Sequence, residues 1–291
     1  MSSSPLSLAP AAREQDRRIG ALFVDRGILS LDDAERVLHL QKEGGLRFGE
    51  AALALGLVTP DQMQAVLASQ FDFSRLSAQA TQVSREVLAA YEPASAAGEA
   101  LRALRTQLVL RWFNGDPLHK MLAVVSPGTG DGRTYLAANL AVTLSQLGER
   151  VLLVDADLRA PRLHEVFGLA NVTGLSSLLA GLELHAAPQS VTGLERLSVL
   201  TAGPIPPNPQ ELLAGSAFAR VLEPLQQEFD VILFDTSPGA PYADADAVSR
   251  VARAALMVVR QHVTQMDQAK AFALRLRDAR TELVGSVLAE H

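Results

Sequence analysis

The chain has 291 residues and a net charge of −6, from 26 lysines and arginines against 32 aspartates and glutamates. This acidic balance argues against a nucleic acid polymer as a ligand, because proteins that bind nucleic acids present a basic surface. The absence of cysteine excludes disulfides, thiolate metal sites and cysteine nucleophiles. Since no apolar stretch has the length of a signal peptide or a membrane span, the sequence predicts a cytoplasmic protein that only a partner would recruit to an inner membrane.

The amino-terminal part of the chain contains an internal repeat. Residues 1–15 are rich in serine, alanine and proline and predict a flexible tail. Residues 18–41 and 47–70 form two copies of one pattern, separated by five residues, and each copy predicts two short helices. The first helix should end at a glycine, and the second should begin at a capping Ser30 or Thr59. A small all-α repeat domain is therefore expected over residues 16–76. The residues that recur at matching places are Arg18/Arg47, Gly20/Gly49, Gly27/Gly56, Leu38/Leu67 and Gln41/Gln70.

The remainder of the chain predicts an α/β domain over residues 96–291. Residues 77–95 are polar and small and are interpreted as a linker. A helix is expected over residues 96–113, and short apolar runs then alternate with helical stretches. This alternation is typical of βαβ units and predicts a mainly parallel sheet flanked by helices. The apolar runs lie at residues 121–125, 151–154, 197–200, 231–234, 255–259 and 284–288.

A glycine-rich loop, SPGTGDGRT over residues 126–134, connects the first predicted strand to a helix. Backbone N–H groups in such a loop, together with the positive end of the helix dipole, can bind phosphate. The usual P-loop pattern is GxxxxGK[ST], and Gly132, Arg133 and Thr134 occupy its last three places. Pro127 replaces the first glycine and Arg133 replaces the lysine, so the loop alone is equally consistent with a simple glycine-rich turn.

Acidic residues at the ends of two later strands favour a nucleotide site. Asp155 and Asp157 follow the run at 151–154, and Asp235 follows the run at 231–234. Taken singly, each aspartate could be a helix cap or a solvated loop residue. The carboxyl ends of parallel strands meet at one edge of the sheet, however, which is where open α/β sheets bind ligands. A hydroxyl and a few carboxylates suffice for Mg²⁺, which keeps waters and phosphate oxygens as its other ligands.

These motifs resemble those of the bacterial tyrosine kinases of capsule and exopolysaccharide synthesis. The resemblance covers about residues 95–291 and includes five motifs in order. The EpsG-type chain-length-determinant kinases of this family also carry GDGR[ST]YLAANLA, so Arg133 matches that subgroup. The counterparts are the loop for Walker A, Asp155-Ala-Asp157-Leu-Arg159 for the D-x-D-x-R motif, Asp235-Thr-Ser-Pro238 for Walker B, Glu99, Arg102 and Arg105 for ExxRxxR, and residues 202–213 for GxxPPNPxELL.

The resemblance implies a P-loop NTPase that uses ATP and Mg²⁺. Arg133 would stand in for the lysine that bridges the β- and γ-phosphates, and Asp155 would polarise an accepting tyrosine hydroxyl. The expected metal residues are Thr134, Asp157 and Asp235, the last through a metal-bound water. The full expected sets are Arg133, Asp155, Asp157 and Asp235 for catalysis, and Gly128, Gly130, Asp131, Gly132, Arg133, Thr134 and Tyr135 for the nucleotide.

The same resemblance implies partners and raises a question about the acceptor. Glu99, Arg102 and Arg105 would mediate self-oligomerisation, and a transmembrane chain-length-determinant protein of the Wzz type would be the membrane partner. The family's autokinases carry a tyrosine cluster at the carboxyl tail, whereas this chain has only Tyr91, Tyr135 and Tyr242. Tyr135 is expected to be buried beside the loop, and Tyr91 is either an acceptor or, as we favour, an anchor of the linker. Autophosphorylation within a tail cluster is not expected.

The amino-terminal repeat resembles the MshEN domain of type II secretion and pilus ATPases, which binds cyclic di-GMP through two such copies five residues apart. The resemblance implies that Arg18 and Arg47 meet phosphate or guanine, and that Gln41 and Gln70 bond a guanine edge. The alternative is a helical docking domain that keeps the pattern for folding. Paired arginines and glutamines are poor core residues, which favours ligand binding.

Three hypotheses for function follow from these patterns. The favoured one is a tyrosine kinase of exopolysaccharide assembly that cyclic di-GMP regulates. The second is a non-catalytic nucleotide switch or scaffold, because Arg133 and the missing tyrosine tail weaken the kinase interpretation. The third is a positioning ATPase of the MinD and ParA type, although Gly128 stands where that class has its signature lysine. Phosphotyrosine, nucleotide binding without transfer, and hydrolysis stimulated by DNA or lipid would distinguish them.

Overall fold

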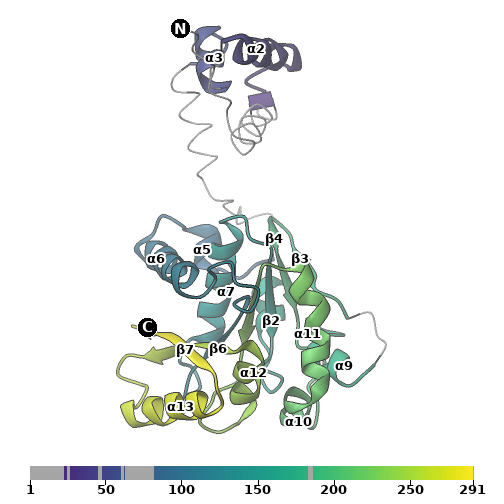
Figure 1. Cartoon of the computed structure of the whole chain (residues 1–291), viewed down its shortest axis with the longest axis vertical. Helices are drawn as coiled ribbons and strands as arrows, with labels where there is room; N and C mark the ends of the chain where they lie inside the picture. Colours follow the sequence, from purple (N-terminus) through teal and green to yellow (C-terminus); the bar gives the residue numbers. More distant parts are fainter. Residues whose placement is uncertain are drawn as a thin grey trace, which may run out of the picture. The chain divides into compact units, whose positions relative to one another are not determined.

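The computed structural model describes residues 23–24, 27–44, 48–59, 62, 82–182 and 186–290. The chain divides into two compact units, residues 1–73 and residues 74–291, which are drawn in Figure 1. The predicted fold class, a P-loop α/β domain with a mainly parallel sheet, is confirmed. Within the described part of the chain, no helix is long and apolar enough to cross a membrane.

The first unit contains α2 (Leu31–Gly44) and α3 (Phe48–Ala54), and its turns repeat as the sequence does. Gly27 N donates to Val24 O at 2.9 Å, and Gly56 N donates to Leu53 O at 3.0 Å. Both glycines have φ of 66°, a left-handed conformation that strains other residues but lets a helix end. The predicted helix ends at Gly27 and Gly56 are therefore confirmed.

The caps that follow these turns are also confirmed. Asp33 N donates to Ser30 Oγ at 3.1 Å, and Gln62 N donates to Thr59 Oγ1 at 3.1 Å. Thr59 N donates in return to Gln62 Oε1 at 2.9 Å, which completes a reciprocal capping box. The side chains between the turns form a small core made of Phe23, Leu29, Val37, Phe48, Ala51, Ala52 and Val58.

A seven-stranded sheet in the order β3-β4-β2-β5-β1-β6-β7 forms the centre of the second unit. All neighbouring strands are parallel except β3, a three-residue edge strand that pairs antiparallel with β4 and that the sequence did not indicate. The central strands are continuous apolar runs, as expected for strands covered on both faces. The bounds are β1 Met121–Val125, β2 Val151–Asp155, β3 Gln189–Val191, β4 Leu194–Leu200, β5 Val231–Asp235, β6 Ala254–Arg260 and β7 Glu282–Ala289.

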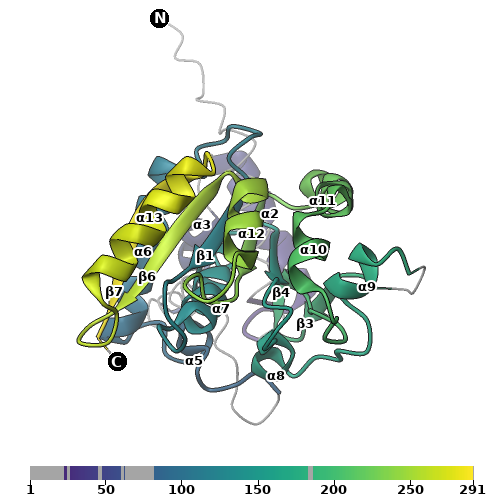
Figure 2. The same cartoon turned by 90° about the horizontal axis from the view of Figure 1, so that it is seen from below.

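Helices cover both faces of this sheet, as Figure 1 and Figure 2 show from two directions. Alternate strand residues point to opposite faces, so Leu122 and Val124 join one core while Ala123 and Val125 join the other. The first core is covered by α5 (Leu88–Tyr91), α6 (Ala96–Arg111), α7 (Arg133–Ser145) and α8 (Leu163–Phe167). The second is covered by α9 (Leu175–Leu179), α10 (Pro209–Ala214), α11 (Ser216–Glu228), α12 (Asp244–Ala252) and α13 (Met266–Asp278).

Residues 82–95, which the sequence suggested were part of a linker, pack against this α/β unit. Val83 and Val87 are buried in the first core, and Ala89 N donates to Asn139 Oδ1 of α7 at 2.8 Å. Tyr91 Oη donates to Val83 O at 2.5 Å, so the interpretation of Tyr91 as an anchor is confirmed. Small and polar residues separate the buried side chains, and only four residues form a helix, so no periodic pattern marked this segment.

Candidate nucleotide-binding site

The glycine-rich loop leaves β1 and ends at the first turn of α7, at the carboxyl edge of the sheet. Gly130 and Gly132 have φ of 76° and 99°, and a Cβ at either position would meet no atom within 4 Å. Their backbone conformation, and not lack of space, therefore requires glycine. Gly132 is the N-cap of α7, so the unpaired N–H groups of the first helical turn face the position where phosphate binds in P-loops.

Arg133, in the place of the P-loop lysine, is turned into the protein. Its Nε donates to Thr236 O at 2.7 Å, and its Nη1 donates to Gly128 O at 2.5 Å and to the Ser126 hydroxyl. The residue is only 8% exposed, and burial lowers the pKa of its guanidinium although the charge of Asp235 opposes this change. In this structure Arg133 thus links the loop to the end of β5.

Asp131 makes contacts within the loop and with the segment that follows β6. Its Oδ2 accepts from Gly128 N at 2.7 Å, and its Oδ1 accepts from the Thr264 hydroxyl at 2.9 Å. Arg260 Nη1 also donates to Gly130 O at 3.2 Å. No sequence pattern indicated Arg260 and Thr264, because they lie about 130 residues further along the chain. The P-loop is therefore held by hydrogen bonds on two sides, to the end of β5 and to the end of β6 with the loop that follows it.

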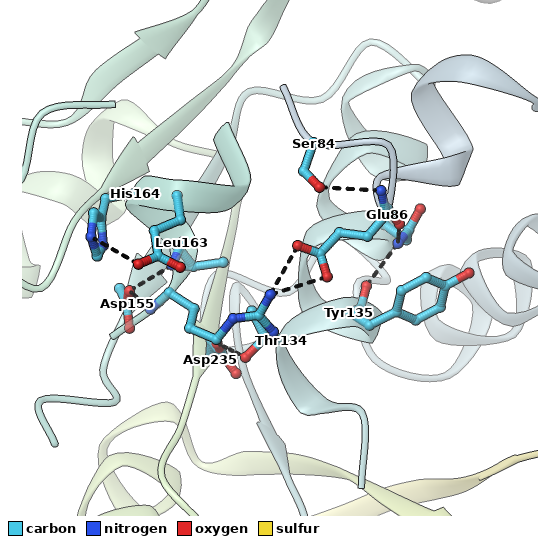
Figure 3. Close-up of polar contacts among 11 residues, drawn as sticks. Ser84, Glu86, Thr134, Tyr135, Asp155, Leu163, His164 and Asp235 are labelled. Atoms are coloured by element: carbon cyan, nitrogen blue, oxygen red, sulfur yellow. Dashed lines mark hydrogen bonds and ion pairs between the residues drawn. The ribbon is translucent and has the colours of Figure 1, made fainter. Parts of the chain in front are cut away.

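The acidic residues meet beside the loop as the sequence suggested. Asp155 and Asp235 are in register on the neighbouring strands β2 and β5, and Figure 3 shows both near Thr134. Thr134 Oγ1 donates to Asp235 Oδ2 at 2.6 Å. Asp155 Oδ2 accepts from the backbone N–H groups of Arg162 and Leu163 at 3.1 and 3.0 Å. The second oxygen of each carboxyl group, Oδ1, is buried without a hydrogen-bond partner.

Burial raises the pKa of the Asp235 carboxyl to about 7, although the hydrogen bond from Thr134 lowers it. Burial also raises the pKa of Asp155 well above its usual range, and the charge of Asp235 adds to this effect. Two buried carboxyl oxygens on neighbouring strands that lack donors fit a hard cation, which favours carboxylate and hydroxyl oxygens. No group of three or more acidic or histidine side chains among the described residues could hold a metal ion, but Mg²⁺ with a nucleotide needs fewer protein ligands.

Asp157 and Arg159 of the D-x-D-x-R motif shape the loop after β2. Asp157 Oδ1 accepts from Arg159 N at 3.1 Å and from Ala160 N at 3.0 Å, which closes a turn. Arg159 forms a two-pronged ion pair with the buried Asp244, at 2.6 and 3.1 Å. The guanidinium also lies 3.9 Å from the ring centre of Tyr242. Asp244 lies on α12 outside every motif, so the sequence did not identify this pair.

Two side chains lie differently from the sequence prediction. Tyr135 lies on the first turn of α7 and is 38% exposed, so the expectation that it is buried beside the loop is wrong. Arg105 is 8% exposed and donates to Thr143 O at 3.0 Å, so it joins α6 to α7 within one chain. Of the proposed oligomerisation residues, Glu99 is exposed and pairs with Arg102 one turn away.

The candidate cyclic di-GMP residues fall mostly outside the described part of the first unit. Arg18, Arg47 and Gln70 lie outside the described residues, and Gln41 is half-buried on α2. Phe23, Phe48 and Ala52 of the same unit are all buried in the small core. Their side chains are thus used for packing within the unit.

Comparison with known proteins matches this chain to a P-loop NTPase profile and to bacterial tyrosine-protein kinases. A protein-family profile described as an iron-transfer P-loop NTPase of the NUBPL type matches residues 117–288. The tyrosine-protein kinase YwqD of Bacillus subtilis is 34% identical over 208 residues, which are 72% of this chain and 87% of that protein. This chain has no cysteine, so it has none of the thiolates that usually hold iron–sulfur clusters.

Solved structures agree with the sequence relatives. The crystal structure of the chimerical protein CapA2B2 has a TM-score of 0.66 at 32% identity and covers 72% of this chain and 92% of that one. The kinase domain of the Escherichia coli tyrosine kinase Etk also has a TM-score of 0.66 at 32% identity, covering 70% of this chain and 79% of that one. The region these matches share is the α/β unit with its P-loop and acidic edge.

Proposed function

We propose that this chain, which belongs to the bacterial tyrosine-protein kinase family, binds ATP with Mg²⁺ and transfers the γ-phosphoryl group to a tyrosine hydroxyl. One observation carries the proposal. Asp155 and Asp235 each keep a buried oxygen without a partner beside Thr134 and the P-loop. Such an arrangement is unfavourable in the free protein and becomes favourable when a cation and phosphates arrive.

The chemistry assigns a task to each residue. Backbone N–H groups of Gly130, Gly132 and the first turn of α7 would bind the phosphates. Thr134, Asp157 and Asp235 would hold Mg²⁺, directly or through water, and the bound cation would neutralise charge on the β- and γ-phosphates. Asp155 would accept the proton of the tyrosine hydroxyl as the new P–O bond forms and the bond to the β-phosphate oxygen breaks.

The proposed role of Arg133 at the β- and γ-phosphates requires a rearrangement. Its guanidinium now donates to Thr236 O, Gly128 O and the Ser126 hydroxyl, so it would have to exchange at least one of these acceptors for a phosphate oxygen. An arginine can do this without losing its charge, but its planar fork differs in geometry from a lysine ammonium. The same contacts support the alternative of a nucleotide switch that binds ATP without transferring it.

The acceptor is proposed to be a tyrosine on another protein of exopolysaccharide assembly. Tyr91 is hydrogen-bonded within the α/β unit, and the chain has only two other tyrosines. A transmembrane chain-length-determinant protein is the proposed membrane partner, and Glu99, which pairs with Arg102, is the exposed residue of the proposed oligomer contact. Site residues and partners are carried from the family resemblance, and the position of each residue at the sheet edge or on α6 supports them.

Regulation by cyclic di-GMP is proposed for the amino-terminal unit. The two copies of the repeat form matching glycine turns and matching caps, so the duplication extends to the hydrogen bonds of the backbone. Arg18, Gln41, Arg47 and Gln70 occupy equivalent places in the two copies and are the proposed ligand residues. Isothermal titration of the full chain with cyclic di-GMP tests this, with Arg18→Ala and Arg47→Ala as variants that should lose binding.

The kinase proposal is tested by incubating the full chain with γ-labelled ATP and Mg²⁺, with and without the partner's cytoplasmic tail and cyclic di-GMP. Phosphotyrosine that disappears in Asp155→Asn supports the proposal. Asp230→Asn, at the opposite end of the neighbouring strand, is the matched control and should keep activity. ATP binding without any labelled tyrosine would favour the switch, and no nucleotide binding at all would exclude both.

A further inference from the structure

Arg162 lies next to the acidic pair, and no motif accounts for its side chain. Its backbone N–H donates to Asp155 Oδ2 at 3.1 Å, so the residue is fixed at the edge of the site. Its Nη2 donates to both carboxylate oxygens of Glu86, at 3.1 and 3.3 Å. These two contacts are the dashed lines that end on the carboxylate of Glu86 in Figure 3.

Three arginines surround the acidic pair, and they differ in how firmly they are held. Arg133 is buried and donates to three acceptors, and Arg159 is paired with a fully buried aspartate, Asp244. Arg162 is 51% exposed at its side chain and contacts a carboxylate that is itself 30% exposed. Exposed ion pairs contribute about 0–1 kcal/mol, whereas breaking a buried pair leaves a desolvated charge. Arg162 is therefore the arginine that can change partner most readily.

The charge of Arg162 also acts on the site from its present position. It lowers the pKa of Asp235, which burial raises, so the guanidinium is close enough to interact with the carboxyl groups that would hold Mg²⁺. An arginine fork matches the geometry of phosphate oxygens and stabilises the charge that spreads over them during phosphoryl transfer.

We propose that Arg162 is a further catalytic residue, whose guanidinium leaves Glu86 and contacts the γ-phosphoryl group of ATP during transfer. This inference rests on the proposed function. In the step, the bond between the γ-phosphorus and the β-phosphate oxygen breaks, the bond to the tyrosine oxygen forms, and the hydroxyl proton passes to Asp155. Arg162 forms no covalent bond and stabilises the charge on the equatorial oxygens of the moving group.

The backbone of Glu86 is held by hydrogen bonds that do not involve Arg162. Its backbone carbonyl accepts from Asn139 Nδ2 at 2.9 Å, and its N–H donates to Ser84 Oγ at 3.3 Å. Ser84 N in turn donates to Val166 O of α8 at 2.7 Å. The segment before the P-loop domain is thus fixed to α7 and α8, and Glu86 competes with phosphate for Arg162 from a rigid position.

Because Glu86 and phosphate would compete for Arg162, variants of the two residues should have opposite effects, which a purely structural ion pair would not produce. In the full chain, Arg162→Gln should lower the rate of phosphoryl transfer on the order of 10²-fold, the effect of losing one transition-state donor. It should weaken binding of Mg·ATP, measured by titration calorimetry, and leave Mg·ADP unchanged, because ADP lacks the γ-phosphate. Glu86→Gln should act in the opposite direction and tighten Mg·ATP, since it removes the competing carboxylate. Arg162→Lys should restore part of the lost rate.

Arg150→Gln is the control, because it breaks an exposed arginine–aspartate pair at the opposite edge of the sheet and should change neither nucleotide affinity nor rate. Equal losses in Arg162→Gln and Glu86→Gln, with equal drops in melting temperature, would identify a purely structural pair and overturn the inference. Wild-type transfer that persists unchanged in Arg162→Gln would overturn it while leaving the proposed function intact. If the unmodified chain binds no ATP, both the inference on Arg162 and the proposed function are wrong.

Discussion

Aspartates lie at both ends of the strand pair β2 and β5, and their carboxyl pKa values shift in opposite directions. At the amino ends, Asp230 accepts from Arg150 N, Nε and Nη2 at 3.0, 3.0 and 2.6 Å. These contacts lower the pKa of Asp230 to about 2. At the carboxyl ends, Asp155 and Asp235 face each other in register, and burial raises the pKa of both.

This difference separates an end of the strands where the aspartate stabilises the fold from the end where a ligand is proposed to bind. A carboxylate with an arginine partner and backbone donors is more stable ionised in the folded chain than in water. Two buried carboxyl groups with one oxygen each unpartnered are less stable ionised, and the proposed cation and phosphates would stabilise their charges. The comparison can be tested by neutralising either end.

The largest expected effect is on activity at the carboxyl ends. Asp155→Asn or Asp235→Asn should lower phosphotyrosine formation on the order of 10³-fold, because the first removes the proposed proton acceptor and the second removes a proposed ligand of the cation. Initial rates with γ-labelled ATP measure this. Asp230→Asn should remain within a few-fold of the unmodified chain, and a similar loss in all three variants would contradict the contrast between the two ends.

The next largest effect is on stability: Asp235→Asn, which should lower activity, should raise the free energy of unfolding. The carboxyl pKa of Asp235 is about 7 in the folded chain and about 4 in the unfolded chain, so the folded state binds the proton more tightly. The resulting stability is present below about pH 4 and is lost as the pH rises through about 7. Asp235→Asn keeps a neutral side chain, so without nucleotide it should be about 2–4 kcal/mol more stable than the unmodified chain at pH 8.

Urea unfolding of the nucleotide-free protein at pH 5 and pH 8 checks this prediction. The gain in unfolding free energy should shrink at the lower pH, where Asp235 of the unmodified chain is already protonated. A variant that is less stable at pH 8 would show that the acid pair stabilises the fold, and the two strand ends would then not differ as inferred.

Arg133→Lys should have an intermediate effect. The lysine ammonium cannot reproduce the fork that donates to Thr236 O and Gly128 O, so the variant should lose about 1–2 kcal/mol of unfolding free energy. Mg·ATP affinity should change at the same time, because the loop that carries the phosphate donors is less firmly held. Thermal unfolding with and without Mg·ATP measures both, and an unchanged melting temperature would show that the buried contacts contribute nothing.

The smallest effect is expected at the amino ends. Asp230→Asn removes a pair that is partly exposed, so it should lower the unfolding free energy at pH 7 by about 1 kcal/mol or less. The contribution of Asp230 is present above its unfolded pKa of about 4 and is lost as the pH falls through about 2. Chemical unfolding at pH 7 and pH 3 should therefore show a smaller difference from the unmodified chain at pH 3. A difference that grows on acidification would contradict this assignment.

Local features of this protein could be predicted from its sequence alone. The strands other than β3, the glycine-rich loop, the acidic ends of β2 and β5 and the caps at Ser30 and Thr59 depend on residues close together in the chain, so a local pattern indicates them. Because parallel strands end at the same edge of a sheet, even the meeting of Asp155 with Asp235 followed from the pattern.

The partners of the polar side chains, in contrast, depend on the tertiary structure. The inward turn of Arg133, the pair of Arg159 with Asp244 and the pair of Arg162 with Glu86 each join residues that are 76 or more positions apart. Nothing in the neighbouring sequence of an arginine specifies which distant acceptor satisfies it, because several acceptors of similar strength meet at one sheet edge. Packing of the whole domain selects among them, and with that selection it decides which arginine is free to meet a phosphate.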